Sequence, residues 1–109
     1  MLFHITPRSD WEAALAHGVY APASLAREGF IHLSSADQWP RTLKRWFPGR
    51  EGLVLLTIDP TKLSAEVRYE AAHDELFPHL HGPLELSSVV VVTELVLGDD
   101  GTHRAVPSR

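Results

Sequence analysis

Two histidines of this 109-residue chain stand inside apolar runs that are near copies of each other. Residues 2–6 read LFHIT and residues 30–34 read FIHLS, so His4 and His32 each precede a hydroxyl residue by two positions. Side chains of a strand alternate between its faces, which places His4 with Thr6 and His32 with Ser34. If the two strands are neighbours, these four hydrogen-bonding groups line one cleft. The alternative is a sheet face that simply meets water.

A carboxylate and two further histidines follow later in the chain. Residues 66–70 read EVRYE, and a strand there puts Arg68 and Glu70 on one face, where a carboxylate can stabilise a developing positive charge. A solvated Arg68–Glu70 pair is the simpler alternative. His79 and His81, in FPHLHGP, share a face if extended, and such imidazoles can bind a transition metal together with His73 and a nearby carboxylate. Because polar loops often carry such residues without binding a metal, we expect no metal.

Composition excludes several classes of function. The chain has no cysteine, which rules out disulfides, zinc–thiolate sites and thiol catalysis. A net charge of −4 argues against a nucleic-acid partner, and no apolar run approaches the length of a membrane helix. No signal peptide, phosphate-binding glycine loop or serine-centred elbow is present. We therefore expect a soluble cytoplasmic domain without a membrane partner, and the sequence makes no prediction of oligomeric state.

The elements that must position these residues indicate an α+β fold. We expect one compact domain over residues 1–109, with a mixed or largely antiparallel sheet and two main helices. A Ser9–Glu12 capping box predicts a helix that ends at Gly18, and a second main helix is expected over residues 36–47 with its aromatic residues toward the core. Strands are predicted over residues 2–6, 30–34, 53–58, 66–71 and 89–97, a short extended piece over 19–21, a short helix after Pro22, a loop over 72–82, and a polar, mobile tail from about residue 98.

Nearly the whole chain resembles one bacterial family. The segments FHIT, SLAREGFIHLS, LVLLTID, RYE and FPHLHGPL, in that order, are similar to those of the domain-of-unknown-function family 952. His81 departs from the pattern, since many members have a tyrosine at that place.

The resemblance implies a fold like that of the ADP-ribosyltransferases, a split-sheet α+β domain around a cleft for NAD. Carried over by position, His4 is the ribose-binding group, His32 lies on the nicotinamide side, and Glu70 is the carboxylate that stabilises the transition state. The implied activity is NAD-dependent transfer of ADP-ribose, or binding of an ADP-ribose-bearing, nucleotide-like small molecule. Further candidate ligand-binding residues are Thr6, Ser34, Arg68, His79 and His81. The alternatives are a non-catalytic small-ligand- or partner-binding module of the same fold and a metal site at His79 and His81.

Overall fold

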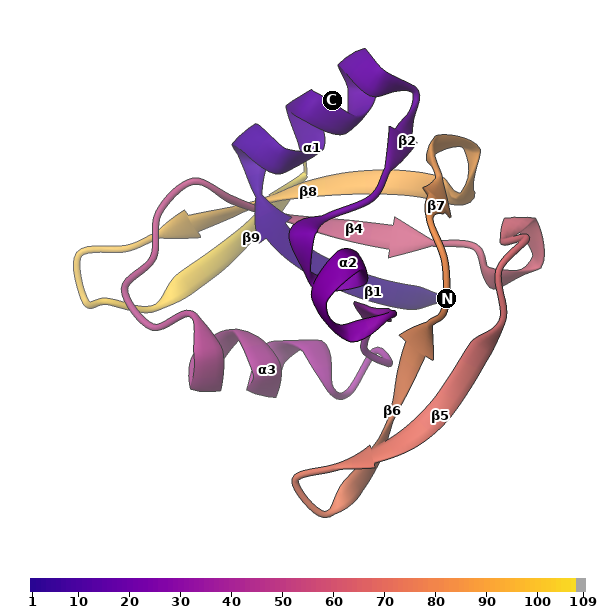
Figure 1. Ribbon diagram of the computed structural model, residues 1–109. Helices are drawn as coiled ribbons and strands as arrows, with labels where there is room; N and C mark the ends of the chain where they lie inside the picture. Colours follow the sequence, from indigo (N-terminus) through magenta and orange to yellow (C-terminus); the bar gives the residue numbers. More distant parts are fainter. Residues whose placement is uncertain (108–109) are drawn as a thin grey trace.

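A four-stranded and a three-stranded antiparallel sheet, joined by a single backbone bridge, organise the fold, and two short strands form a third sheet (Figure 1). The computed structural model describes residues 1–107. Its α-helices are α1 (Arg8–His17), α2 (Ala23–Glu28) and α3 (Trp39–Trp46). Its strands are β1 (Leu2–Pro7), β2 (Val19–Tyr20), β3 (Ile31–His32), β4 (Leu53–Ile58), β5 (Val67–Ala72), β6 (Glu75–Leu80), β7 (Leu84–Glu85), β8 (Val89–Leu97) and β9 (His103–Pro107).

Strand β4 is the centre of the larger sheet, whose strand order is β1-β4-β8-β9. Its sequence LVLLTI is almost uninterrupted in apolar residues, and such a run suits a strand that is buried on both faces. Val54 and Leu56 join one core cluster, which also holds Trp11 and Tyr20. Leu55 points the other way, into a cluster under α3. The sheet is therefore covered on both sides rather than facing water.

The smaller sheet has the order β3-β6-β5 and touches the larger sheet through Phe3 and Ser34. The Phe3 N–H donates to the Ser34 carbonyl and the Ser34 N–H donates to the Phe3 carbonyl, both over 2.8 Å. This bridge brings the two histidine-bearing segments side by side, which is the condition on which the predicted shared cleft depends. The predicted split sheet is thus present, and every strand pair within residues 1–107 is antiparallel.

The helices differ from the sequence prediction at their first turns. Helix α1 begins at Arg8, one residue before Ser9, and Pro7 is its N-cap without a side-chain hydrogen bond. The predicted Ser9–Glu12 capping box is therefore wrong. The start is fixed instead by the Arg8 N–H, which donates to the Gly52 carbonyl over 2.7 Å, and by an ion pair between the Arg8 guanidinium and Glu94. Helix α3 begins at Trp39 rather than at residue 36, because residues 36–38 form a turn.

The predicted loop over residues 72–82 is instead largely a strand. Residues 75–80 form β6, which pairs with β5 in a hairpin whose two loop residues are His73 and Asp74. Both have positive φ, 51° and 67°, as a type I′ turn requires. Asn-Gly and Asp-Gly are the usual signatures of that turn, and His73-Asp74 does not carry them. Sequence reasoning missed the hairpin for this reason.

The predicted tail from about residue 98 also forms structure. The chain turns at residues 98–101, where the Gly98 N–H donates to the Thr102 carbonyl over 2.8 Å, and β9 then pairs with β8. One edge of β8 pairs with β4, and β9 pairs with the other edge. Residues 108 and 109 of the predicted tail lie outside the described residues.

The predicted α+β class of one compact domain is confirmed. The short helix after Pro22, the short extended piece at residues 19–20 and the strand over 89–97 are all found. Within residues 1–107, no helix is both long and apolar enough to cross a membrane.

Leu56 gives a test of this architecture, because it is fully buried at the centre of β4. Leu56→Ala should lower the free energy of unfolding by about 2–5 kcal/mol, since it opens a cavity where both sheets and α1 meet. Urea denaturation followed by circular dichroism measures the change. The control is Val91→Ala on neighbouring β8, where the side chain is exposed and the expected loss is within about 0.5 kcal/mol. Equal losses in the two variants would contradict the assignment of β4 as the core strand.

Candidate functional site

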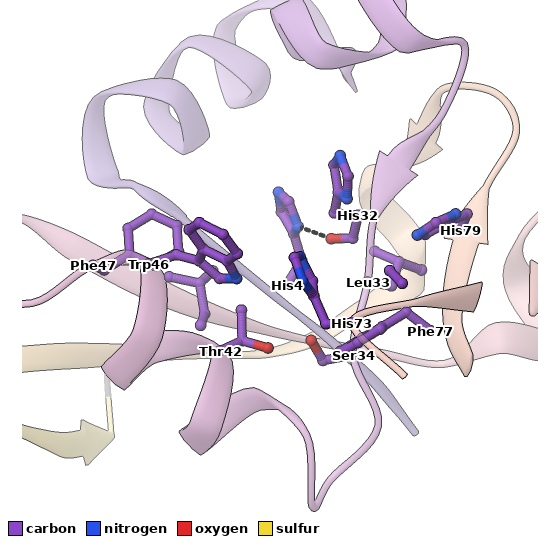
Figure 2. Close-up of a pocket in the computed structure, with 12 residues that line it drawn as sticks. His4, His32, Leu33, Ser34, Thr42, Trp46, Phe47, His73, Phe77 and His79 are labelled. Carbon is purple, nitrogen blue, oxygen red and sulfur yellow. Dashed lines mark hydrogen bonds between the residues drawn. The ribbon is translucent and has the colours of Figure 1, made fainter. Parts of the chain in front are cut away.

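A cavity of about 460 Å³ opens beside the bridge between the sheets (Figure 2). One wall comes from α3 and the residue after it, with Trp46 and Phe47, and the facing wall carries His32 and His79. His4 lies between the two walls. The complete lining is His4, Ile5, His32, Leu33, Ser34, Thr42, Trp46, Phe47, Ala72, His73, Phe77 and His79. We call this cavity the cleft.

His4 is held at the base of the cleft by two hydrogen-bond partners. Its Nδ1–H donates to the carbonyl of His32 over 2.6 Å, and its Nε2 lies 2.8 Å from the hydroxyl of Tyr20. Tyr20 in turn hydrogen-bonds Thr6, with 2.9 Å between the two hydroxyl oxygens. Because a carbonyl only accepts, the neutral imidazole carries its proton on Nδ1, and Nε2 accepts from Tyr20. The predicted pairing of His4 and Thr6 on one face therefore exists, with Tyr20 between them.

Burial keeps His4 neutral. It lowers the His4 pKa to about 4, and the hydrogen bond to the His32 carbonyl offsets the effect only in part. The same burial raises the pKa of Tyr20 to about 12, so its hydroxyl keeps its proton. His4 thus presents a neutral, fixed ring to a ligand in the cleft rather than a positive charge.

His32 lies on the rim of the cleft and is more exposed than His4. Its Nε2 is 2.9 Å from Glu28 at the end of α2, and both side chains are well exposed. This contact with His32 lowers the pKa of Glu28. Ser34, two residues on, is buried and lines the cleft as the sequence predicts. The structure therefore brings together His4, His32 and Ser34, with Thr6 just behind them.

Glu70 does not line the cleft. Its Oε1 accepts from His79 Nδ1 over 2.7 Å and from His81 Nε2 over 3.0 Å. These hydrogen bonds, the one from His79 first, lower the pKa of Glu70 and keep it ionised. His79 is buried and lines the cleft, so Glu70 reaches the cleft only through that imidazole. His81 stays outside the lining.

Arg68 lies apart from the other candidate residues. Its Nε donates to Glu66 Oε1 over 3.0 Å, and both side chains are exposed. The predicted solvated pair along this strand is present, but with Glu66 in the place of Glu70. An exposed pair of this kind contributes little to stability.

Sequence reasoning missed the wall contributed by α3. Trp46 and Phe47 fit the helical period of a core face, yet the Trp46 side chain is more than half exposed where it borders the cleft. Thr42 on the same helix adds a hydroxyl group to the lining. Phe77 was hidden within the predicted loop. The sequence signal for this wall was the number of aromatic residues on one face of the helix. The core cluster beneath α3 is too small to bury all of these rings.

The open end of the cleft is bordered by α3 and the tip of the β5–β6 hairpin. The Arg45 guanidinium lies 5.1 Å from the centre of the Trp46 ring, and Trp46 lies 5.3 Å from the His73 ring. Arg41 pairs with Glu75 over 2.7 Å, which joins the helix to the hairpin. Arg45 has no carboxylate partner within residues 1–107, and its Nη2 lies 3.5 Å from Nδ1 of His73, so its positive charge is not neutralised beside the cleft.

A metal site at His79 and His81 would require nitrogen atoms of both imidazoles to point at one common position. Both imidazoles donate to the same oxygen of Glu70, and His73 lies at the far end of the hairpin. Among residues 1–107, no three histidine, aspartate or glutamate side chains are grouped to hold a metal ion.

Both the sequence and the fold of this chain are similar to those of known proteins. The model of a family described as "Protein of unknown function (DUF952)" matches residues 5–92. The chain is similar to protein CC0527 from Caulobacter crescentus, a Northeast Structural Genomics Consortium target: its crystal structure superposes with a TM-score of 0.85 and 36% identity, over 94% of this chain and 92% of that one. The solution NMR structure of CC0527 gives a TM-score of 0.78 and 37% identity, over 92% and 88%. No curated protein matches the chain.

The neutral state of His4 predicts a pH dependence of stability. Its pKa falls from 6.5 to about 4 on folding, so between these pH values only the unfolded chain binds the proton. The stabilisation is therefore fully present above pH 6.5 and is lost as the pH falls toward 4, by roughly 3 kcal/mol in total. Urea unfolding at pH 7 and pH 4.5 should show a larger loss for the wild type than for His4→Gln. His17→Gln, which changes an exposed histidine, is the control and should follow the wild type. Parallel pH profiles for the wild type and His4→Gln would contradict the burial of a neutral His4.

Proposed function

The chain belongs to the DUF952 family of proteins of unknown function, and we propose that it binds NAD or another ADP-ribose-bearing small molecule in the cleft. The observation that carries the proposal is that His4 and His32, from separate strands, line one cavity together with Ser34 and aromatic side chains. The resemblance to the ADP-ribosyltransferase fold supports the same ligand class.

The chemistry of the lining suits a nucleotide-like ligand. Flat rings of Trp46, Phe77 and His32 offer faces on which a planar base or nicotinamide can stack. Hydroxyl groups of Ser34 and Thr42 can hydrogen-bond a ribose. A volume of about 460 Å³ lies within the range of small-molecule pockets and suits one half of a dinucleotide, with the remainder extending through the mouth.

Charge at the mouth supports the same orientation. Arg45 lies over the Trp46 ring and beside His73, without a carboxylate partner in the described part of the chain, and a guanidinium whose charge is not neutralised can bind phosphate. We therefore propose that the base or nicotinamide enters between the rings while Arg45 contacts the pyrophosphate. NAD, when bound, supplies an ADP-ribosyl group whose bond to nicotinamide breaks with positive charge developing on the sugar.

Transfer of ADP-ribose is the finer form of the proposal, with Glu70 as the carboxylate that stabilises this charge. Its position behind His79 favours the second candidate, a non-catalytic small-ligand-binding module of the same fold, because Glu70 does not reach the cleft directly. Both forms share the cleft and the ligand, and they differ in what Glu70 does.

Binding is tested by calorimetric titration of NAD and ADP-ribose into the wild type and His32→Ala. The variant should lose affinity by about tenfold, since it removes one ring and one hydrogen-bonding group from the rim at a cost near 1.4 kcal/mol. His17→Ala changes an exposed histidine at the end of α1 and should bind like the wild type. Absence of binding to the wild type, or equal affinity of wild type and His32→Ala, would refute the proposal.

Glu70→Gln separates the two forms. It preserves the shape of the side chain while removing the charge, so a transferase should lose turnover of NAD with little change in affinity. A binding module should show no turnover in either protein. Release of nicotinamide, followed by chromatography, is the measurement. Equal release by the wild type and Glu70→Gln would rule out the transition-state role of Glu70.

A further inference from the structure

The geometry points to His79 as a proton acceptor that faces the cleft, with Glu70 as the positioning residue that fixes its ring. The group that gives up the proton is a hydroxyl of the bound molecule or a water molecule held beside it. In this one respect the inference rests on the proposed function, because the ligand of the cleft supplies that hydroxyl or holds that water. The state of the His79 ring itself can be measured without any ligand.

The His79 ring has a single well-defined orientation. Phe30 stacks on it with ring centres 4.1 Å apart and an angle of 15° between the planes. The side chain is 7% exposed, and Glu70 Oε1 lies 2.7 Å from Nδ1. Turning the ring over would break the Glu70 contact and place a C–H group against the carboxylate. The ring is therefore held by stacking on one side and by a hydrogen bond at one nitrogen.

The same contact fixes which nitrogen carries the proton. An ionised carboxylate only accepts hydrogen bonds, so Nδ1 of His79 must be the donor. The lone pair of the neutral ring is then on Nε2. His81 has the opposite arrangement, because it donates to Glu70 through its Nε2. One carboxylate thus selects two different tautomers in neighbouring histidines.

Nε2 is the nitrogen of His79 that remains available to a ligand. It has no hydrogen-bond partner within residues 1–107. Glu85 Oε1 is the one side-chain nitrogen or oxygen in this range that is both fully buried and unpartnered, so Nε2 of His79 keeps some access to solvent. His79 lines the cleft and is otherwise covered by Phe30 and its own strand. Because Nδ1 is taken by Glu70, Nε2 is the nitrogen through which His79 can act on a molecule in the cleft that it lines.

The proposed step is a simple proton transfer. The O–H bond of the ligand hydroxyl or water breaks, its electron pair stays on oxygen, and an N–H bond forms at Nε2 of His79. The resulting imidazolium is stabilised by Glu70 through the Nδ1–H bond. Besides Glu70, the ionisable groups near this ring are His81, His32 and Glu28.

The neighbouring Glu28–His32 pair lacks these features. Both of its side chains are well exposed, and nothing buries the His32 ring as Phe30 and the strand bury His79. The competing explanation of the Glu70–His79 contact is a structural tie between β5 and β6. Such a tie would contribute to stability, but it would not require a reactive lone pair on Nε2.

The first measurement is the tautomer of each histidine in the ¹⁵N-labelled wild type, read from two-bond ¹H–¹⁵N correlations at pH 7.5. His79 should be the Nδ1–H form and His81 the Nε2–H form. The second measurement is the rate at which diethyl pyrocarbonate, which acylates the unprotonated nitrogen, modifies His79, followed by peptide mass spectrometry. Glu70→Leu removes the acceptor and should move His79 toward the Nε2–H form, so that modification slows several-fold.

The control is Glu28→Leu, which removes the partner of His32 and should leave the His79 rate unchanged. A wild type with His79 in the Nε2–H form, or equal His79 rates in the wild type and Glu70→Leu, would overturn the inference. The wild type alone tests the inference even if Glu70→Leu does not fold, because a structural tie predicts the same tautomer but leaves His79 resistant to the reagent. Saturating NAD should protect His79 from the reagent. If NAD fails to protect His79 while the tautomer and the effect of Glu70→Leu are as expected, the proposed ligand is contradicted. The inferred state of His79 is not affected by that result.

Discussion

The two reciprocal hydrogen bonds between the backbones of Phe3 and Ser34 are the constraint on which the site depends. They attach the smaller sheet to the edge of the larger one at a single point, and the sheets diverge on either side of it. His4 follows Phe3 directly and His32 precedes Ser34 by two residues, so the bridge sets how far apart the two histidines lie. The His4 bond to the His32 carbonyl reinforces the same junction.

The histidines around this junction differ in their burial and in their hydrogen-bond partners. His4 is desolvated and closed into hydrogen bonds with Tyr20 and the backbone, so it acts as a fixed neutral surface. His79 is buried and has one nitrogen held by a carboxylate, while the other has no partner within residues 1–107. His32 is paired at the rim, where water competes with Glu28. Residues of one type thus acquire distinct chemical character from burial and from the partner of each nitrogen.

Local patterns predicted the elements better than their pairing. The alternation in LFHIT and FIHLS was sufficient to place His4 with Thr6 and to bring His32 and Ser34 to the cleft, because period-2 patterning survives wherever one face is packed. Glu70 was placed on the right strand but assigned directly to the cleft. Its partner His79 belongs to a hairpin strand that the His73-Asp74 turn disguised as a loop. The register of the hairpin places His79 between Glu70 and the cleft. This register cannot be predicted from local sequence patterns.

The contact between α3 and the hairpin tip has a consequence for how the cleft behaves in solution. Arg41 and Glu75 join two walls that belong to different parts of the chain, and Gln38 adds hydrogen bonds to Glu75 and to the Leu76 carbonyl. The ion pair lies near the surface, where dissolved salt screens it over about 10 Å at 0.1 M. The width of the cleft therefore depends on ionic strength. At low salt the Arg41–Glu75 ion pair holds α3 against the hairpin, while at high salt the ion pair weakens and the hydrogen bonds of Gln38 hold the two walls together.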